Sequence, residues 1–250
     1  MKIIGTGSAL PEQIITNEDL TKFLDTSDEW IVSHTGIRER RVLDRESVND
    51  IGTLAARRAL EDAGLALEEL DLLICSNVAS DYFTPGPACF IAGALGFSGQ
   101  TLDMNGACTG FLQALDIADA YLRAGKARNV LIVAAEKPSY LADWTDRATC
   151  VLFGDGAGAV VLQNSEPSGC IATCIATQPN EDFLNMPTPA GNCPFTHREG
   201  AGGYLRMNGQ EVYKFAVHTI VDEVRAALEE LALQPQDVSL YLLHQANKRI

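Results

Sequence analysis

The sequence predicts an α/β fold with a largely parallel sheet, and three observations support this prediction. Residues 71–75 and 130–135 form continuous apolar runs, which are typical of strands buried on both faces of a parallel sheet. Segments such as 48–63 and 111–122 have apolar residues at the spacing of a helix, with a period of about 3.6 residues. The order strand–helix–strand restarts after about residue 169. Strands that alternate with helices indicate a sheet that is covered by helices.

The first 162 residues are expected to alternate short strands with helices. Strands are expected at 2–4, 71–75, 101–104, 130–135, 150–153 and 157–162, and helices at 18–24, around 30–31, at 48–63, 86–95 and 111–122. Asn17 and Thr26 are expected to cap the first two helices. Gly36 and Gly64 are expected to end the second and third helices, because glycine readily adopts the left-handed conformation that follows many helices.

The later part of the chain is less regular. A strand is expected at 170–177, a long loop at 179–203, a helix from 208 to about 231, a strand at 238–243 and a helix from 244. Asn208 and Glu211 have the spacing of a capping box for the first of these helices. The last helix stops after about two turns without a cap, and so short a helix is marginal in isolation. We therefore expect the chain to be cut inside an element after Ile250.

Composition limits the classes of function. The chain has 250 residues, of which 46% are hydrophobic and 21% charged, as in ordinary globular proteins. A net charge of −14 argues against general binding of nucleic acids, and an acidic partner would need a local basic patch. Seven cysteines form no paired framework, which fits a reducing cytoplasm. The sequence shows no secretory signal and no apolar run of membrane-spanning length.

The stretch Asp103–Phe111, which reads D-M-N-G-A-C-T-G-F, carries the first candidate for chemistry. Cys108 follows an expected strand and lies at the first turn of an expected helix. The free N–H groups and the positive dipole end of a helix favour thiolate, so a pKa below the free value of about 8.5 is expected. Gly106 and Gly110 leave room for a ligand near the sulfur. Two interpretations remain open: a nucleophile that forms a thioester, or a small buried side chain.

His244 is the second candidate, at the end of an expected strand in H-Q-A-N-K-R-I. Ligands gather at the carboxyl ends of strands in open α/β sheets, so Cys108 and His244 could face a common pocket. The imidazole could donate a hydrogen bond to a thioester oxygen or accept a proton. The alternative interpretation is a lone structural histidine.

Five motifs together resemble a known family. These are T-S-D-E-W-I, T-G-I-R-E-R-R, D-M-N-G-A-C-T-G-F, F-G-D-G-A-G-A and H-Q-A-N-K-R-I, in this order along the whole chain. They are similar to those of β-ketoacyl-acyl-carrier-protein synthase III, which begins bacterial type II fatty-acid synthesis. The resemblance implies a thiolase-like fold of two similar α/β halves in αβαβα layers, and a homodimer. We expect the halves at 1–168 and 169–250, the second incomplete.

The resemblance also implies a reaction in two stages. Cys108 takes an acyl group from a short acyl-coenzyme A, and the carbanion formed by decarboxylation of malonyl-carrier protein then attacks the acyl-cysteine. The resemblance implies no cofactor and no metal, because coenzyme A enters as part of the thioester substrate. His244 matches a histidine that shares an oxyanion hole with an asparagine. That asparagine lies in a G-N-T-S-like turn that these residues do not contain, so a verified 250-residue chain is expected to condense poorly.

Binding residues are also implied by the resemblance. Trp30 and Arg147 would hold the adenine of coenzyme A, Arg38 and Arg40 would lie near its phosphates, and Asn247 would also contact it. The family often has arginine where this chain has His34, which replaces a permanent charge with a titratable one. The acidic carrier protein would bind a local patch, for which Arg206 is a weaker additional candidate. The implied members of this patch are Gln245, Ala246, Asn247, Lys248, Arg249 and Lys214.

Two further patterns have plainer interpretations. F-G-D-G-A-G-A lacks the spacing of a dinucleotide loop and precedes a strand-like A-V-V-L, so we expect a tight turn. Cys170 and Cys174 share a face of an expected strand, and two buried cysteines are expected there in preference to a metal site. Residues 82–87 are expected to shape the end of an acyl pocket in a dimer.

Alternatives to the synthase are a related acyltransferase of polyketide or quinolone assembly, a hydroxymethylglutaryl-coenzyme A synthase, or a non-catalytic partner of the same fold.

Overall fold

The computed structural model describes residues 1–187 and 203–250. The chain forms two compact units, each assembled from three segments. Unit 1 consists of Met1–Ile15, Arg40–Tyr140 and Gly154–Ile175, and unit 2 consists of Thr16–Glu39, Leu141–Phe153 and Ala176–Ile250. The expected halves at 1–168 and 169–250 stay a prediction. No helix in the described ranges is long and apolar enough to cross a membrane.

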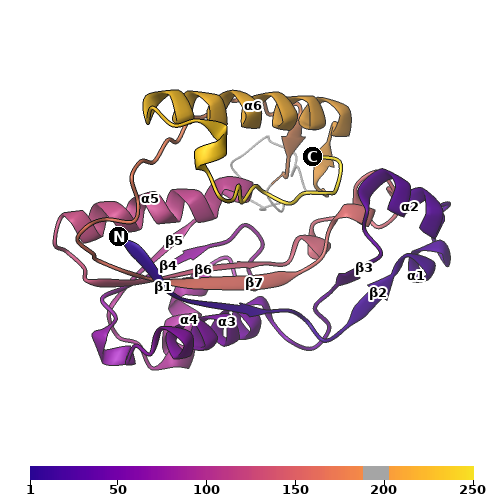
Figure 1. The fold of residues 1–250 in the computed structure, drawn as a ribbon. Coiled ribbons are helices and arrows are strands. Elements are labelled where there is room, and N and C mark those ends of the chain that lie inside the picture. The colour runs from indigo at the N-terminus through magenta and orange to yellow at the C-terminus, as the bar shows by residue number, and fades with distance from the viewer. Residues whose placement is uncertain (188–202) are drawn as a thin grey trace, which may run out of the picture. The chain divides into compact units, whose positions relative to one another are not determined.

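Unit 1 is built on a five-stranded sheet in the order β1-β7-β6-β4-β5 (Figure 1). Its strands are β1 (Lys2–Ala9), β4 (Leu72–Ser76), β5 (Gln100–Met104), β6 (Asn129–Glu136) and β7 (Gly156–Gln163). β4 pairs in parallel with β5 and β6, whereas β7 pairs antiparallel with β6 and β1. Within this sheet four strands therefore run the same way, which confirms the predicted largely parallel sheet, whereas β7 runs against them and makes the sheet mixed.

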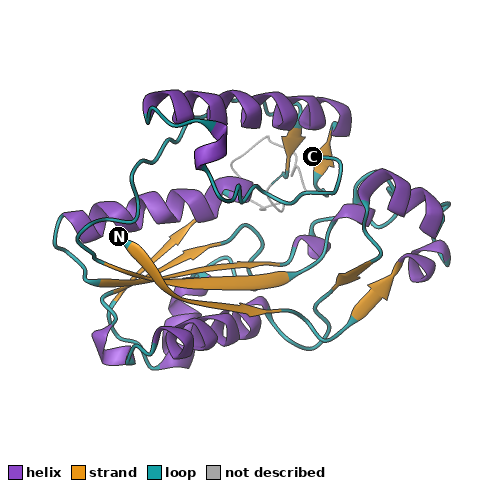
Figure 2. Ribbon diagram, in the orientation of Figure 1, coloured by secondary structure: helices purple, strands orange, loops and turns teal. Residues whose placement is uncertain are grey.

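Helices cover both faces of this sheet (Figures 1 and 2). Helices α3 (Val48–Ala63) and α4 (Pro87–Leu95) lie on one face, and α5 (Gly110–Arg123) lies on the other. Side chains of β4 alternate between the two cores, because successive residues of a strand point to opposite faces. Leu73 and Cys75 join the core beneath α3 and α4, whereas Leu72 and Ile74 join the core beneath α5. All four are buried, as the apolar run 71–75 predicts.

Helix α3 approaches β1 closely because β1 carries glycines. A Cβ atom at Gly7 would lie 2.2 Å from the carbonyl oxygen of Ala55, and one at Gly5 would lie 2.4 Å from that of Ala59. Neither space can hold a methyl group. The predicted limits of α3 are confirmed, and Gly64 follows it with φ of +60°.

Unit 2 contains α1 (Asn17–Thr21), α2 (Asp28–Thr35), α6 (Gly209–Glu230) and an antiparallel pair of two-residue strands, β8 (Leu184–Asn185) and β9 (Arg206–Met207). β2 (Ile14–Thr16) and β3 (Glu39–Arg41) form another two-stranded sheet. Short 3₁₀ turns, η1 to η5, lie at Leu67–Glu69, Ala107–Thr109, Pro138–Tyr140, Cys150–Leu152 and Pro235–Asp237.

Two predicted caps are each wrong by one residue. Thr16 caps α1, and its hydroxyl accepts from the Asp19 N–H while the Asp19 carboxylate accepts from the Thr16 N–H. Ser27 caps α2 by accepting from the N–H of Trp30. Adjacent residues can both cap a helix, and the sequence does not show which one takes the extended conformation. Gly36, with φ of +76°, ends α2, and Asn208 caps α6, both as predicted.

Four predicted elements do not form. Residues 150–153 contain the 3₁₀ turn η4, and residues 170–177, 238–243 and 244–250 contain neither strand nor helix. A strand is stable only when a neighbouring strand satisfies its backbone groups, and strand propensity depends strongly on that context. Leu242 shows the consequence, because its side chain is 83% exposed. Of the expected loop 179–203, residues 188–202 lie outside the described residues.

Candidate active site

Cys108 lies in the predicted strand-to-helix turn. β5 ends at Met104, the 3₁₀ turn η2 covers Ala107–Thr109, and α5 begins at Gly110. Ala107 has φ of +45°, in the left-handed region that a residue with a side chain rarely adopts. Strained backbone of this kind clusters at functional sites, where the surrounding structure holds it in place. Cys108 is exposed, so a substrate can reach it.

The start of α5 sits directly on the end of β4. A Cβ atom at Gly110 would lie 2.1 Å from the Ser76 hydroxyl oxygen, so glycine permits this close packing. Asn77 then links three strand ends: its N–H donates to the carbonyl of Met104 at 3.0 Å, and its side-chain amide donates to the carbonyl of Ala135. The Cys108 turn is therefore fixed by the carboxyl ends of β4, β5 and β6.

The electrostatic expectation for Cys108 is wrong. Although Cys108 is exposed, desolvation by the surrounding protein atoms raises the pKa of its thiol above the ordinary value, a backbone N–H lowers this pKa, and the negative charge of Glu136 raises it further. The sequence indicates that Cys108 lies at a helix N-terminus, but it does not show that the Glu136 carboxylate acts on the thiol. The thiol therefore stays mostly protonated at neutral pH, and its activation requires a proton acceptor or the loss of the opposing charge.

Glu136 ends β6 and anchors the segment that follows β4. Its carboxylate accepts from the N–H of Val78 at 2.9 Å and from that of Ala79 at 3.3 Å. Burial raises the pKa of Glu136, although these hydrogen bonds oppose the shift. The pKa of the buried Cys75 thiol is raised much more strongly than that of Cys108, chiefly by burial and further by the charges of Asp103 and Glu136. Cys75 is therefore a poor nucleophile compared with Cys108.

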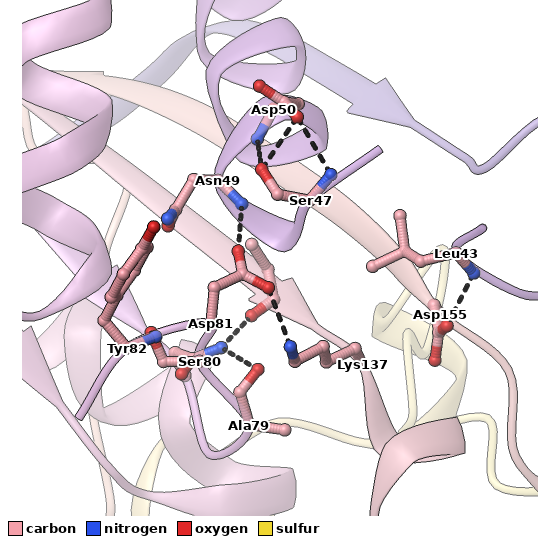
Figure 3. A network of polar contacts seen from close by, with 12 residues as sticks. Leu43, Ser47, Asn49, Asp50, Ala79, Ser80, Asp81, Tyr82, Lys137 and Asp155 are labelled. Carbon is pink, nitrogen blue, oxygen red and sulfur yellow. Dashed lines mark hydrogen bonds and ion pairs between the residues drawn. The ribbon is translucent and has the colours of Figure 1, made fainter. Parts of the chain in front are cut away.

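A polar network ties the same segment to α3 (Figure 3). The Asp81 carboxylate accepts from Lys137 at 2.7 Å and from the N–H of Asn49 at 3.2 Å. Asp155, in F-G-D-G-A-G-A, is buried and accepts from the N–H of Leu43 and from the hydroxyl of Ser139, at 2.8 and 2.7 Å. These carboxylates connect loops at the strand ends of unit 1, and the glycine motif is a structural turn leading into β7.

Trp30 and Arg147 lie together in unit 2, as the resemblance implies. The guanidinium carbon of Arg147 lies 5.0 Å from the centre of the half-buried Trp30 ring, a cation–π contact. Arg147 also donates to the carbonyl oxygen of Asp25 at 2.5 Å. The His34 ring stacks on Trp30 with centres 4.4 Å apart and planes at 24°.

The two arginines expected near the phosphates differ. Arg38 is exposed and available to a ligand. Arg40 is only 5% exposed and donates to the carbonyl of Ile15 at 3.2 Å, so its assignment to the phosphates is wrong. Burial of a guanidinium requires hydrogen-bond partners, and this one serves as a tether between neighbouring segments.

The residues from His244 onward are exposed or half-buried and form turns. The N–H of Lys248 donates to the carbonyl of Thr35 at 3.0 Å, which attaches this segment to the end of α2. The Asn247 side chain accepts from the N–H of Arg249 at 2.8 Å. Lys214 is exposed but pairs with Glu211 at 2.6 Å, so part of its charge is neutralised locally. Gln245, like His244, is exposed, and Ala246 is half-buried.

Cys108 belongs to unit 1, whereas His244, Trp30 and Arg147 belong to unit 2. Their convergence in one pocket therefore stays a prediction. Among the described residues, no group of three or more His, Cys, Asp or Glu side chains could hold a metal ion. Cys174 is exposed and Cys170 half-buried, so the expected pair of buried cysteines is wrong because the strand that would bury them does not form.

Comparisons with known proteins agree with the motifs. The family model for 3-oxoacyl-[acyl-carrier-protein (ACP)] synthase III matches residues 102–179. The β-ketoacyl-[acyl-carrier-protein] synthase III of Clostridium acetobutylicum is 44% identical over 253 residues, which cover 100% of this chain and 78% of the relative. The corresponding enzyme of Aquifex aeolicus is 46% identical over 252 residues, covering 100% and 77%.

The chain belongs to the β-ketoacyl-acyl-carrier-protein synthase III family. It is therefore an acyltransferase of the condensing type. The crystal structure of the Aquifex aeolicus synthase III matches with a TM-score of 0.89 and 45% identity over 99% of this chain and 77% of that chain, which confirms the thiolase-like fold. The priming β-ketosynthase of the R1128 polyketide pathway matches with a TM-score of 0.89 and 34% identity over 99% and 75%.

Three polar residues at the strand ends of unit 1, namely Asn77, Glu136 and Asp155, were not predicted from the sequence. Glu136 could have been found, because it is a carboxylate at the end of a predicted central strand, where functional groups gather. Asp155 lies within F-G-D-G-A-G-A, where the glycines give the stronger sequence signal. Asn77 gave no signal, because its role depends on two carbonyl groups from distant strands.

Proposed function

We propose that this chain carries out the synthase III reaction, in which a short acyl-coenzyme A and malonyl-carrier protein give 3-oxoacyl-carrier protein, carbon dioxide and coenzyme A. The match over the full chain to synthase III relatives carries this proposal. The exposed Cys108 in a glycine-lined strand-to-helix turn supports it independently. This reaction would be the first condensation step of fatty-acid synthesis, in the cytoplasm.

Cys108 is the proposed nucleophile. Its sulfur attacks the thioester carbonyl carbon, a new carbon–sulfur bond forms, and coenzyme A leaves with the proton of the thiol. Malonyl-carrier protein then loses carbon dioxide, and the electron pair of the broken carbon–carbon bond forms an enolate. The enolate carbon attacks the acyl-cysteine and releases the Cys108 thiolate. His244 would donate a hydrogen bond to the enolate oxygen.

Coenzyme A would bind through Trp30, Arg147, Arg38 and Asn247. The contact between Arg147 and Trp30 supports a joint role of these two side chains in holding the adenine. Arg38 is exposed and could therefore bind a phosphate. The carrier protein would bind Gln245, Ala246, Asn247, Lys248, Arg249 and Lys214. The attachment of Lys248 to the end of α2 supports one continuous surface from the coenzyme A residues to this basic segment.

We also propose a homodimer, with neither nucleic acid nor membrane as a partner. β5 lies at the edge of the sheet, and all five of its residues are exposed or half-buried. An exposed edge strand can pair with another chain, and the same strand of a second copy is the simplest partner. The net charge of −14 opposes binding to nucleic acids.

The test is acetylation of Cys108. Incubation with acetyl-coenzyme A should add one acetyl group, located at Cys108 by peptide mass spectrometry, and malonyl-carrier protein should then remove it as product. Cys108→Ala should abolish the label, whereas Cys89→Ala, at another exposed cysteine, should not. A label that persists in Cys108→Ala would contradict the assignment. Acetyl-, isobutyryl- and longer acyl-coenzyme A substrates would define the acyl preference.

A further inference from the structure

His34 and Trp30 are four residues apart on α2, so their side chains lie on the same side of the helix. Their rings are stacked, with centres 4.4 Å apart and planes at 24°. Such offset stacking of aromatic rings is favourable beyond the area that it buries. The imidazole therefore lies against the indole instead of extending freely from the helix.

A hydrogen bond fixes this arrangement. Nδ1 of His34 lies 2.7 Å from the carbonyl oxygen of Trp30, and a carbonyl only accepts, so Nδ1 carries the proton and donates it. The Ser33 hydroxyl donates to the same carbonyl at 2.9 Å and lies 3.1 Å from Nδ1. The imidazole is therefore bonded to the backbone of the residue on whose ring it stacks.

Arg147 is held less firmly against the same indole. Its guanidinium carbon lies 5.0 Å from the centre of the indole, and its anchor is the backbone and carboxylate of the exposed Asp25, the carboxylate being 4.0 Å away. An aromatic base between guanidinium and indole needs two stacking distances of about 3.5 Å each. The present gap is too narrow for a base. Arg147 must therefore withdraw when a base binds to the face of the indole that the guanidinium covers.

We propose that His34 is a positioning residue for Trp30, holding the indole by stacking and by its backbone hydrogen bond so that the purine of coenzyme A can stack on it. This inference rests on the proposed function of Trp30. This role differs from that of a permanent charge, which the arginine often found at this position in the family would supply, because the imidazole is occupied with the indole. Loss of the ring should weaken binding of the nucleotide half of coenzyme A and leave the pantetheine half unaffected.

The experiment measures binding of coenzyme A and of pantetheine by calorimetry, which requires no acetylation of Cys108. His34→Ala should raise the dissociation constant for coenzyme A roughly two- to tenfold, the value of one aromatic pair. His34→Phe, which keeps a ring but no nitrogen, should recover most of this loss. His218→Ala, an exposed histidine on α6 of the same unit, is the matched control.

Three results would overturn the inference. One is an unchanged dissociation constant for coenzyme A in His34→Ala. Another is equal weakening for coenzyme A and pantetheine, which would indicate general damage. The third is tighter binding in His34→Arg with no recovery in His34→Phe, which would indicate a phosphate contact. Acetylation of Cys108 is measured separately, so the proposed function can stand when the inference fails.

Discussion

At the scale of single residues, two opposing influences act on Cys108. A backbone N–H in the turn at the start of α5 lowers the pKa of the thiol, whereas desolvation by the surrounding protein atoms and the charge of Glu136 raise it. The second influence is larger. A thiol whose pKa is raised is protonated at neutral pH and becomes thiolate only as the pH rises above the ordinary cysteine range, near 8.5.

Replacement of Glu136 should make Cys108 more reactive. Glu136→Gln removes the negative charge, which lowers the pKa of the thiol and moves the midpoint of alkylation to lower pH. The measurement is the rate of iodoacetamide labelling at Cys108 against pH, followed by peptide mass spectrometry. Glu61→Gln, the same change at an exposed site on α3, is the control and should leave the midpoint unchanged. An unmoved midpoint in a folded Glu136→Gln variant would exclude this role.

Removal of the indole at residue 30 should affect coenzyme A substrates alone. Stacking of a base on an aromatic side chain is worth about 1–3 kcal/mol, so Trp30→Ala should raise the KM for acetyl-coenzyme A roughly five- to a hundredfold. The KM for malonyl-carrier protein should stay unchanged. Trp144→Phe, at the second tryptophan of the chain, is the control. An unchanged KM in Trp30→Ala would remove the assignment.

At the scale of elements, α3 has a doubly supported start. Ser47 and Asp50 form a reciprocal capping box, and the N–H of Asn49 donates to the Asp81 carboxylate (Figure 3). Asp81 in turn forms an ion pair with Lys137, whose side chain is only 15% exposed. The beginning of α3 is therefore connected through one carboxylate to the segments that follow β4 and β6.

Loss of the cap should destabilise the protein by a modest amount. Ser47→Ala removes the acceptor for the N–H of Asp50 and should lower the free energy of unfolding by about 1 kcal/mol, with a range of about 0.5–2 kcal/mol. Urea denaturation followed by circular dichroism measures the change. The exposed Ser98→Ala is the control, with an expected change within about 0.5 kcal/mol. Equal stability of Ser47→Ala and the unaltered protein would show that Asp81 suffices.

Elements with a strong local signal were predictable, and elements that depend on distant partners were not. The apolar run 71–75 and the period of 48–63 correspond to β4 and α3 almost residue for residue. The segment 238–243 is equally apolar, but it pairs with no strand within residues 1–187 and 203–250 and stays irregular. The position of Cys108 followed from its own neighbours in sequence. Its pKa did not, because Glu136 approaches from another strand.

At the scale of the whole molecule, the net charge determines how an acidic carrier protein could bind. A net charge of −14 repels an acidic carrier protein, so binding must rely on a local group of basic side chains. The exposed Lys248 and Arg249 belong to the proposed patch, whereas Lys214 is paired with Glu211. Arg249 is therefore the better single test of the patch.

Arg249→Glu should separate the two half-reactions. The reversed charge should raise the KM for malonyl-carrier protein by about fivefold or more and make it less sensitive to salt, while acetylation of Cys108 keeps its rate. Arg225→Glu makes the same charge change on α6 and should alter neither step. Equal loss of both half-reactions in Arg249→Glu would mean general damage to the enzyme.

The close approach of β1 to α3 has a consequence for how this sequence can vary. The spaces beside Gly5 and Gly7 are filled by backbone atoms of the helix, which cannot rotate aside as a side chain can. A saturation library at these two positions, selected for folded protein, should return glycine alone, whereas the neighbouring exposed Ile3 should accept many residues. Evolution of the first strand is therefore restricted at these two positions, although the weak apolar pattern of this strand does not indicate any such restriction.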